Sequence, residues 1–482
     1  MQMESENTEK VCVFFIGWSW VKGIVAKIMA KIDKIVKQAR KMVKDDPRKL
    51  IHSLKVGITL TLVSLFYYFQ PLYRNFGVSA MWAVTTVVVV FEFSVGATLG
   101  KGLNRGFATL VGGVLGIGAH HLAVVSGHSG QPILIGLFVF LQAMVSTFIR
   151  FFPQVKSRYD YGMLIFILTF SMVSISGLRT DEILELVQKR LSTVLIGAAT
   201  CVVVSILVCP VWAGEDLHVL VAQNINKLGN FLEGFSDECF KPSEGGDSKN
   251  ERSTLVCLNS VLDSKSNLEN LANFAKWEPC HGGFMYRHPW KQYLKIGNLT
   301  RQCACRVEAL NGYINSRTQG PEWMTGIVQE SFSSMSSECA KVLKELACNI
   351  ETMTKPPFSD PTMARLKLAS KNLKSLLKSK LLEDTNLMQI IHVAAVASLL
   401  IDTVIYVENI TEAVTELSSL AKFKSKDATG IPGESAAMDI IGQSPKQIAT
   451  GDISCVRIDI DGADPIKKEG LPSVQNFECK YI

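Results

Sequence analysis

Positively charged side chains beside apolar stretches are the residues of this sequence best placed to do chemistry. Five of them lie at the ends of predicted hydrophobic helices: Lys101, Arg105, Arg150, Arg158 and Arg179. A charge within or beside hydrocarbon costs several kcal/mol unless it faces water or a partner, and rings of Arg and Lys line anion pores. We therefore treat these five cations as candidate pore residues. The alternative is that they are ordinary loop-end cations that only set the topology.

Few carboxylates lie close enough in the sequence to neutralise these cations. They are Glu92, Asp160 and the acids of the loop after the fifth hydrophobic stretch, Asp181, Glu182 and Glu185. Glu92 ends the second stretch, and we expect it to pair with Lys101 or Arg105. The excess of cations favours anions over cations as the transported species.

Other chemistries lack their motifs. The run from Gly96 to Gly102 superficially resembles a phosphate-binding loop, but its glycine spacing is one residue short and no Ser or Thr follows Lys101. The Cys and His residues between Cys280 and Cys305 match no zinc module well. No nucleophile motif, zinc-protease helix or dinucleotide fingerprint is visible. The sequence therefore predicts a protein that is not an enzyme, with no cofactor and no assigned metal site.

The composition indicates an apolar part joined to a polar part. The chain has 482 residues, of which 48% are hydrophobic and 20% are charged, and its mean hydropathy is +0.21. The net charge is +6, with a dense basic cluster from Lys10 to Lys49. Such a cluster beside a membrane span is typical of a cytoplasmic topology signal or of a contact with anionic lipid. We therefore expect membrane lipid, and no nucleic acid, as a partner.

Six hydrophobic stretches are candidates for membrane spans. Their bounds are 50–69, 78–93, 105–125, 132–152, 159–177 and 191–212. A helix needs about 17 to 25 residues to cross hydrocarbon, and the second stretch is short unless its flanks contribute. The sequence predicts an all-α membrane protein with six transmembrane helices, followed by a cytoplasmic helical domain.

The positive charges of the loops predict the orientation. Lys and Arg are retained on the cytoplasmic side, and they occur in the N-terminal segment and in the loops after the second and fourth stretches. The loop after the first stretch has only Arg74, and the loop after the third has none. Both termini are therefore predicted to be cytoplasmic.

The flanking regions complete the predicted domain organisation. Residues 1–49 form a basic amphipathic segment, whose helix over 18–43 fits either the inner leaflet or the surface of the soluble part. Residues 50–212 form the membrane domain and residues 213–424 the helical domain, with helices expected at 254–274, 290–315, 323–354, 363–380 and 387–424. The Gly-, Pro- and Ser-containing residues 425–482 are expected to be a disordered tail.

Several long strings resemble the aluminium-activated malate transporters of plants. They are Ala80-Met-Trp-Ala, the run from Val90 to Gly106, Phe151-Phe-Pro with Tyr159-Asp-Tyr-Gly, Cys209-Pro-Val-Trp-Ala-Gly-Glu-Asp-Leu-His, Trp277-Glu-Pro and Arg287-His-Pro-Trp-Lys-Gln-Tyr. The resemblance covers about residues 45 to 425 and not the tail. It implies a homodimeric anion channel whose pore lies between the two membrane domains and is lined by basic residues, with malate, other dicarboxylates and inorganic anions as cargo.

Passive, voltage-driven efflux follows from that resemblance. A cytosol negative by about 100 mV drives a dianion outward with roughly 4 to 5 kcal/mol. The alternative is an ion-coupled dicarboxylate carrier, which would need an intramembrane acid chain or paired broken helices, and a third possibility is a membrane scaffold. We favour the plasma membrane over the vacuolar membrane, although no address motif decides between them.

Aluminium gating does not follow from the family name. A hard trivalent cation prefers carboxylate oxygens, as other hard cations do, and Asp181, Glu182 and Glu185 offer these on the predicted outer side. The first outer loop offers no acid and places Arg74 there instead. A site that needs acids from both loops would be impaired, so the sequence disfavours aluminium gating and leaves it open.

Overall fold

The described part of the chain is almost entirely helical. The computed structural model describes residues 27–69, 81–127, 129–177, 183–238, 248–315, 322–356, 361–380 and 387–425. Within these ranges the β structure consists of two isolated bridges, His281 with Phe284 and Thr354 with Lys424. The predicted all-α class is confirmed.

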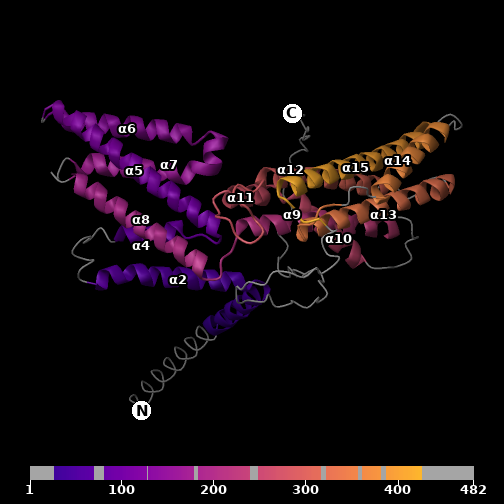
Figure 1. Cartoon of the computed structure of the whole chain (residues 1–482), viewed down its shortest axis with the longest axis horizontal. Helices are drawn as coiled ribbons and strands as arrows, with labels where there is room; N and C mark the ends of the chain where they lie inside the picture. Colours follow the sequence, from indigo (N-terminus) through magenta and orange to yellow (C-terminus); the bar gives the residue numbers. More distant parts are fainter. Residues whose placement is uncertain are drawn as a thin grey trace, which may run out of the picture.

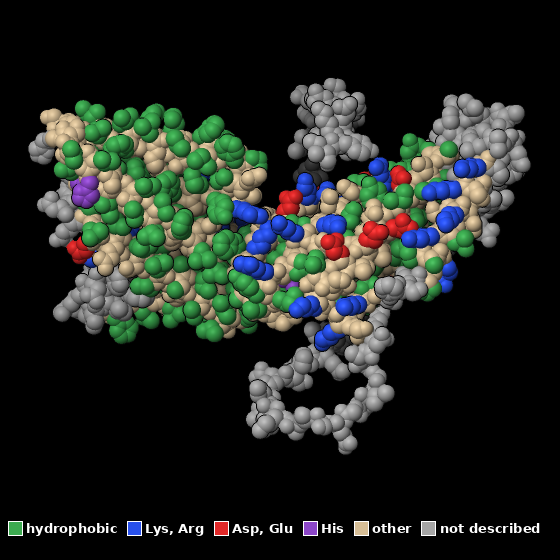
Figure 2. All heavy atoms as spheres, turned by 45° about the horizontal axis from the view of Figure 1, so that its top comes forward, with side chains coloured by type: hydrophobic (Ala, Val, Ile, Leu, Met, Phe, Trp, Pro, Cys, Tyr) green, Lys and Arg blue, Asp and Glu red, His purple; other side chains and the backbone are tan. Residues whose placement is uncertain are grey.

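Six helices that run back and forth form one half of the molecule, which we call the apolar bundle (Figure 1). They are α2 (Pro47–Tyr68), α4 (Met81–Val90), α5 (Val95–Val125), α6 (Gln131–Ile149), α7 (Pro153–Ser176) and α8 (Ile183–Leu207). The long helix α5 packs against α7 and α8, and α4 packs against α8. On the face shown in Figure 2, hydrophobic side chains are spread over the whole apolar bundle, whereas most charged side chains lie at its boundary with the other half and on that half. Such a surface is typical of a membrane-embedded protein.

Five described helices are long and apolar enough to cross a membrane. Four of them are α5, α6, α7 and α8, which coincide with four of the six predicted stretches, and the fifth is Ala394–Leu420. The second stretch forms α4, an apolar helix of only 10 residues, and α2 does not meet the same criterion. The count of six spans therefore stays a prediction.

The described part of the C-terminal half contains seven further helices around one core. They are α9 (Ala213–Glu238), α10 (Ser248–Leu262), α11 (Lys265–Ala275), α12 (Trp290–Asn315), α13 (Glu322–Glu351), α14 (Pro361–Lys380) and α15 (Leu387–Leu420). The apolar segment Ala394–Leu420 lies in α15 and buries Val407, Ile410, Val414 and Leu417 in this core. Packing within the C-terminal half thus accounts for its hydropathy.

Two helices of the apolar bundle begin earlier than predicted. α5 begins at Val95 rather than at 105, because Ser94 caps it by accepting a hydrogen bond from the Ala97 backbone N–H at 3.3 Å. α8 begins at Ile183 rather than at 191. Lys101 and Arg105 therefore lie inside a helix, and Arg190, which the sequence placed in a loop, does so too.

The flanking segments are described only in part. Residues 27–45 form the predicted amphipathic helix, and all of its described side chains are exposed, so it does not pack on the C-terminal half. The rest of the N-terminal segment and the predicted disordered tail lie outside the described residues, apart from Ser425.

Glycines set the close approach of α5 to its neighbours, the usual use of small residues in membranes. A Cβ atom at Gly116 would lie 2.9 Å from Val173 on α7, and one at Gly113 would lie 2.7 Å from Val187 on α8. Gly118, on the exposed side of the same helix, has no neighbour within 4 Å of such an atom. Gly118 therefore serves as the control position for a substitution at Gly116 on the same helix.

Replacing Gly116 by Val should destabilise the apolar bundle by about 1 to 3 kcal/mol, because the added methyl groups overpack the contact with Val173. Gly118→Val adds the same atoms on the exposed side and should change stability by less than about 0.5 kcal/mol. Thermal unfolding of the purified protein in detergent, followed by size-exclusion fluorescence, measures both. Equal melting temperatures for the two variants would contradict the packing described here.

Candidate functional site

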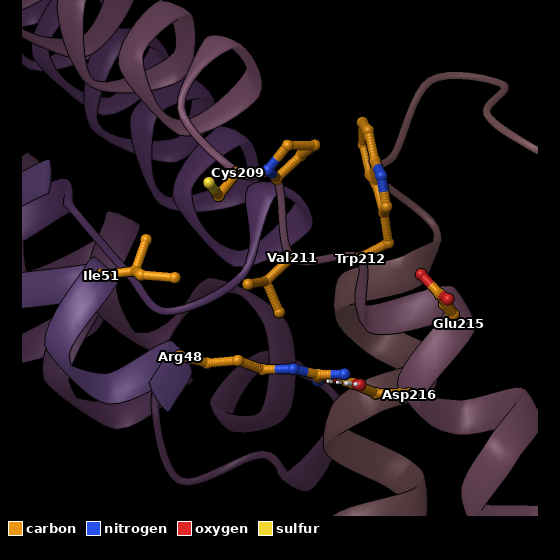
Figure 3. A pocket seen from close by; sticks show the side chains of 8 residues that line it. Arg48, Ile51, Cys209, Val211, Trp212, Glu215 and Asp216 are labelled. Atoms are coloured by element: carbon orange, nitrogen blue, oxygen red, sulfur yellow. Dashed lines mark hydrogen bonds and ion pairs between the residues drawn. The ribbon is translucent and has the colours of Figure 1, made fainter. Parts of the chain in front are cut away.

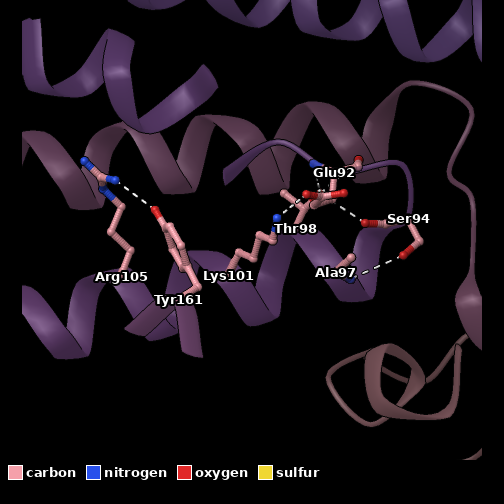
Figure 4. Close-up of polar contacts among 7 residues, drawn as sticks. All are labelled: Glu92, Ser94, Ala97, Thr98, Lys101, Arg105 and Tyr161. Carbon is pink, nitrogen blue, oxygen red and sulfur yellow. Dashed lines mark hydrogen bonds and ion pairs between the residues drawn. The ribbon is translucent and has the colours of Figure 1, made fainter. Parts of the chain in front are cut away.

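Two of the candidate pore cations pair with acids at the end of the bundle that faces the C-terminal half. Lys101 forms an ion pair with Glu92 (Figure 4), as the sequence predicted. Arg150 binds Asp160 through two hydrogen bonds, with Nε to Oδ1 at 2.7 Å and Nη2 to Oδ2 at 3.1 Å. These side chains remain partly exposed. The charges of Lys101 and Arg150 are therefore compensated where the bundle meets solvent.

Arg105 lies deeper and has no acidic partner. One turn beyond Lys101 on α5, its side chain is 3% exposed. Its Nη1 donates a hydrogen bond to the Tyr161 hydroxyl at 2.8 Å (Figure 4), while its Nε has no partner. It forms no ion pair with any described carboxylate. Arg105 therefore has a neutral hydroxyl, and no described carboxylate, as its hydrogen-bond partner.

Arg190 is a second buried cation, which the sequence analysis missed as a site residue. It lies on α8, its side chain is 5% exposed, and its guanidinium carbon lies 4.0 Å from the centre of the Trp82 ring. A cation over an aromatic face is stabilised by the ring quadrupole. Its Nη1 contacts the Met172 sulfur, and its Nε has no partner. The sequence analysis began this hydrophobic stretch at residue 191, whereas α8 begins about two turns earlier, at Ile183. A prediction with the earlier start would have placed Arg190 inside the helix.

Arg105 and Arg190 lie on two helices that pack against each other, α5 and α8. Arg105 adjoins Gly106, where a Cβ atom would lie 3.4 Å from Leu195 of α8. Arg190 lies between Leu195 and Val187, which a Cβ atom at Gly113 of α5 would approach to 2.7 Å. Tyr161, Trp82 and Met172 surround them with neutral groups. Removing an unpaired charge from water costs several kcal/mol, and an anion held between two such cations offsets that cost. The arrangement is thus suited to bind an anion inside the bundle.

The remaining predicted site residues are elsewhere. Arg158 is exposed at the start of α7, where its backbone oxygen accepts a hydrogen bond from the Asn104 side chain at 3.0 Å. Glu185 pairs with Lys189 at 2.6 Å. The other outer residues, Arg179, Asp181 and Glu182, lie outside the described residues. Of the five predicted pore cations, only Arg105 is both described and buried without an acid.

A buried lysine that the sequence analysis did not single out has a structural role. Lys55 on α2 is 1% exposed, and its Nζ donates to the Cys209 carbonyl at 2.8 Å. Cys209 follows α8 with a φ of +44°, a conformation that few residues adopt. A cation near a helix C-terminus is favoured by the helix dipole. Lys55 therefore fixes the exit of α8 towards the C-terminal half.

The joint between the two halves centres on Glu278 of the Trp-Glu-Pro motif. Its carboxylate accepts hydrogen bonds from the backbone N–H groups of Ala213 at 2.6 Å and Gly214 at 2.9 Å, at the start of α9. Burial raises the pKa of Glu278, and the N–H groups of Gly214, Ala213 and Gly96 oppose that rise. Gly96 lies in the first turn of α5. One carboxylate therefore meets the N-terminal ends of two helices, where negative charge is favoured.

Further contacts surround this joint. Arg48 at the start of α2 reaches Asp216 on α9 at 2.8 Å across a pocket of about 220 Å³ (Figure 3). The Trp212 ring stacks on His281, with 3.9 Å between the ring centres. His281 therefore packs against an aromatic ring. The described residues contain no group of three or more His, Cys, Asp or Glu side chains placed to hold a metal ion.

Comparison with known proteins shows which family this sequence resembles. The family model described as aluminium activated malate transporter matches residues 40–386. Aluminum-activated malate transporter 2 of Arabidopsis thaliana is 56% identical over 401 residues, which cover 83% of this chain and 80% of that protein. Aluminum-activated malate transporter 1 of the same plant is 50% identical and covers 86% of each chain. Aluminum-activated malate transporter 1 of Triticum aestivum is 44% identical, over 80% of this chain and 85% of its own.

Replacing Glu278 by Gln should destabilise the protein by about 1.5 to 3 kcal/mol, because an amide offers one acceptor oxygen where the carboxylate offers two charged ones. Glu215→Gln is the matched control, since Glu215 is an exposed acid in the first turn of the same α9. Thermal unfolding of the full chain compares the two variants. If Glu278→Gln cost no more than Glu215→Gln, the carboxylate would not hold the joint.

Proposed function

The chain belongs to the aluminium-activated malate transporter family, and we propose that it is a channel through which malate and other anions cross a plant membrane passively. The observation that carries this proposal is the pair of buried, acid-free cations, Arg105 and Arg190. The named relatives are malate transporters, and malate is a dianion that two cations can compensate. The family membership and the site chemistry therefore point to the same cargo.

The proposed path runs from the paired cations at the mouth to the buried pair. Lys101 and Arg150, each held by its acid, present partly exposed positive charge at the end next to the C-terminal half. Arg105 lies about one turn deeper than Lys101 on α5, and Arg190 lies on the neighbouring helix α8, between the levels of Gly106 and Gly113 of α5. An anion would shed water between the two guanidinium groups and be released because each contact is weak enough to break. We propose that the chain works as a homodimer, as the resemblance implies.

Orientation follows from the same charges. The ends of the bundle that carry Lys101, Arg150 and Arg158 adjoin the C-terminal half (Figure 1), and the positive-inside rule assigns such ends to the cytosol. We propose that six helices span the membrane, that α9 to α15 and both termini are cytosolic, and that the protein acts in the plasma membrane. A negative membrane potential then drives a dianion outward with roughly 4 to 5 kcal/mol.

A coupled carrier is less well supported by the described residues. Ion coupling needs an acid within the membrane that can lose and regain a proton or hold a cation. The described carboxylates of the bundle, Glu92, Asp160 and Glu185, are each engaged by a lysine or arginine. Glu185 is also one of the three acids proposed to sense aluminium, so its pairing with Lys189 would have to be broken for that role.

Arg190→Gln and Arg105→Gln should each reduce the malate current roughly tenfold to a hundredfold, the loss expected when a hydrogen bond to a charged group worth about 1.5 to 3 kcal/mol is removed. Two-electrode voltage clamp of oocytes that express surface-verified protein measures the current, with malate or chloride exchanged and aluminium added outside. Lys189→Gln is the matched control for the current measured without aluminium, because it removes the same charge from the adjacent, partly exposed position on α8, and its current should then stay within about twofold of wild type.

The reversal potential separates a channel from a carrier. For a channel it should follow the malate gradient and be unaffected by external pH or sodium. Full malate current in both Arg105→Gln and Arg190→Gln would contradict the proposed site, and a reversal potential that shifts with proton or sodium gradients would establish the carrier instead.

A further inference from the structure

An apolar groove on the outside of the bundle ends at a cluster of cations that the transport site does not use. The groove lies between α5 and α7 and has a volume of about 510 Å³. Leu103, Phe107, Val111, Met163 and Phe166 line it, together with Tyr159 and Asn104. Phe107 is 71% exposed, so the groove opens towards the surroundings of the bundle. Its dimensions and apolar lining suit a hydrocarbon chain.

Trp277 closes the end of the groove nearest to the C-terminal half. A Cβ atom added at Gly100 of α5 would lie 2.9 Å from its ring, so the indole packs directly on that helix. The ring is 37% exposed. Tryptophan is enriched where hydrocarbon meets the headgroup region. The groove therefore runs from membrane depth to the level of the headgroups.

Three cations gather at this end. Lys276 precedes Trp277, Arg158 precedes Tyr159 of the groove wall, and Lys291 lies at the start of α12. Lys276 and Lys291 line one pocket beside Trp290, and the Arg158 backbone oxygen accepts a hydrogen bond at 3.0 Å from Asn104 of the groove wall. Burial and the charges of Arg158 and Lys291 lower the pKa of Lys276. None of the three forms an ion pair with a described carboxylate. Lys and Arg side chains also gather where the hydrophobic surface gives way to the C-terminal half (Figure 2).

We propose that this groove binds one anionic phospholipid of the inner leaflet, with an acyl chain between α5 and α7 and the phosphate against Arg158, Lys276 and Lys291. Charge complementarity selects the occupant, because a zwitterionic headgroup would bring its own cation to a cluster whose neighbouring acid, Glu278, is buried and already held by backbone N–H groups. Since Lys276 and Lys291 belong to the C-terminal half, the lipid joins that half to the bundle. The inference rests on the membrane placement of α5 and α7 given in the proposed function, and not on transport itself.

Native mass spectrometry of the purified full-length chain in detergent tests this site, with dioleoyl phosphatidic acid and dioleoyl phosphatidylcholine as probes. Wild type should bind phosphatidic acid at least tenfold more tightly than phosphatidylcholine. Arg158→Gln combined with Lys276→Gln should weaken phosphatidic acid binding roughly tenfold or more, because each cation near a headgroup contributes about 1 kcal/mol. Lys371→Gln combined with Lys374→Gln removes two exposed cations from α14 and should leave binding unchanged.

A variant that fills the groove distinguishes three cases: a lipid bound through its acyl chain and headgroup, a lipid bound through its headgroup alone, and a second copy of the chain bound in the groove. A Cβ atom at Gly162 makes ordinary contacts of 3.6 Å with Asn104, so Gly162→Leu should fold and occupy the groove. It should reduce phosphatidic acid binding although all three cations remain. Equal binding of both lipids to wild type would overturn the proposal. Retention of phosphatidic acid by the Gly162→Leu protein would overturn it as well. Loss of the dimer from the mass spectrum of this variant, with lipid still bound, would also overturn it. Because the readout is lipid mass, none of these outcomes depends on an anion current.

Discussion

An arginine keeps its charge in any protein environment, and this constraint organises the apolar bundle. A guanidinium group that leaves water must find a carboxylate, an aromatic face or neutral hydrogen-bond acceptors, or else bear the full cost of desolvation. At the mouth, Glu92 and Asp160 compensate Lys101 and Arg150. Deeper in the bundle, Tyr161 and Trp82 support Arg105 and Arg190 without neutralising them. Arg105 and Arg190 thus have no carboxylate partner among the described residues, which is why we propose that a transported anion binds there.

At the joint between the halves the buried charge is negative, and backbone groups rather than side chains stabilise it. There a single buried acid, Glu278, is held by backbone N–H groups at the starts of α9 and α5 rather than by a cation. Partial charges at helix ends are fixed in direction, so they position the carboxylate more firmly than a flexible lysine would. At the end of α8 the charges are reversed, because the Lys55 ammonium group donates a hydrogen bond to the Cys209 carbonyl oxygen. Both contacts connect the helices that carry the site to the C-terminal half.

These two regions meet on α5. Its first turn touches Glu278, its next turns carry Lys101 and Arg105, and its glycines bring α7 and α8 close. The C-terminal half therefore contacts the helix that carries Arg105, and the groove proposed to bind a lipid lies along that same helix.

The sequence by itself determined the family, the helical class and most helices of both halves, because these depend on local apolar spacing and on long motif strings. It also named Lys101, Arg105 and Arg150 as candidates, and it offered Lys101 or Arg105 as the partner of Glu92. Tertiary structure decided which of these residues are paired and which are buried. Hydropathy could not show that α8 begins at Ile183 and buries Arg190, nor that the apolar segment of α15 is covered by its neighbours. Burial and pairing arise between segments far apart in the chain, and a one-dimensional pattern carries no record of which helix faces will meet.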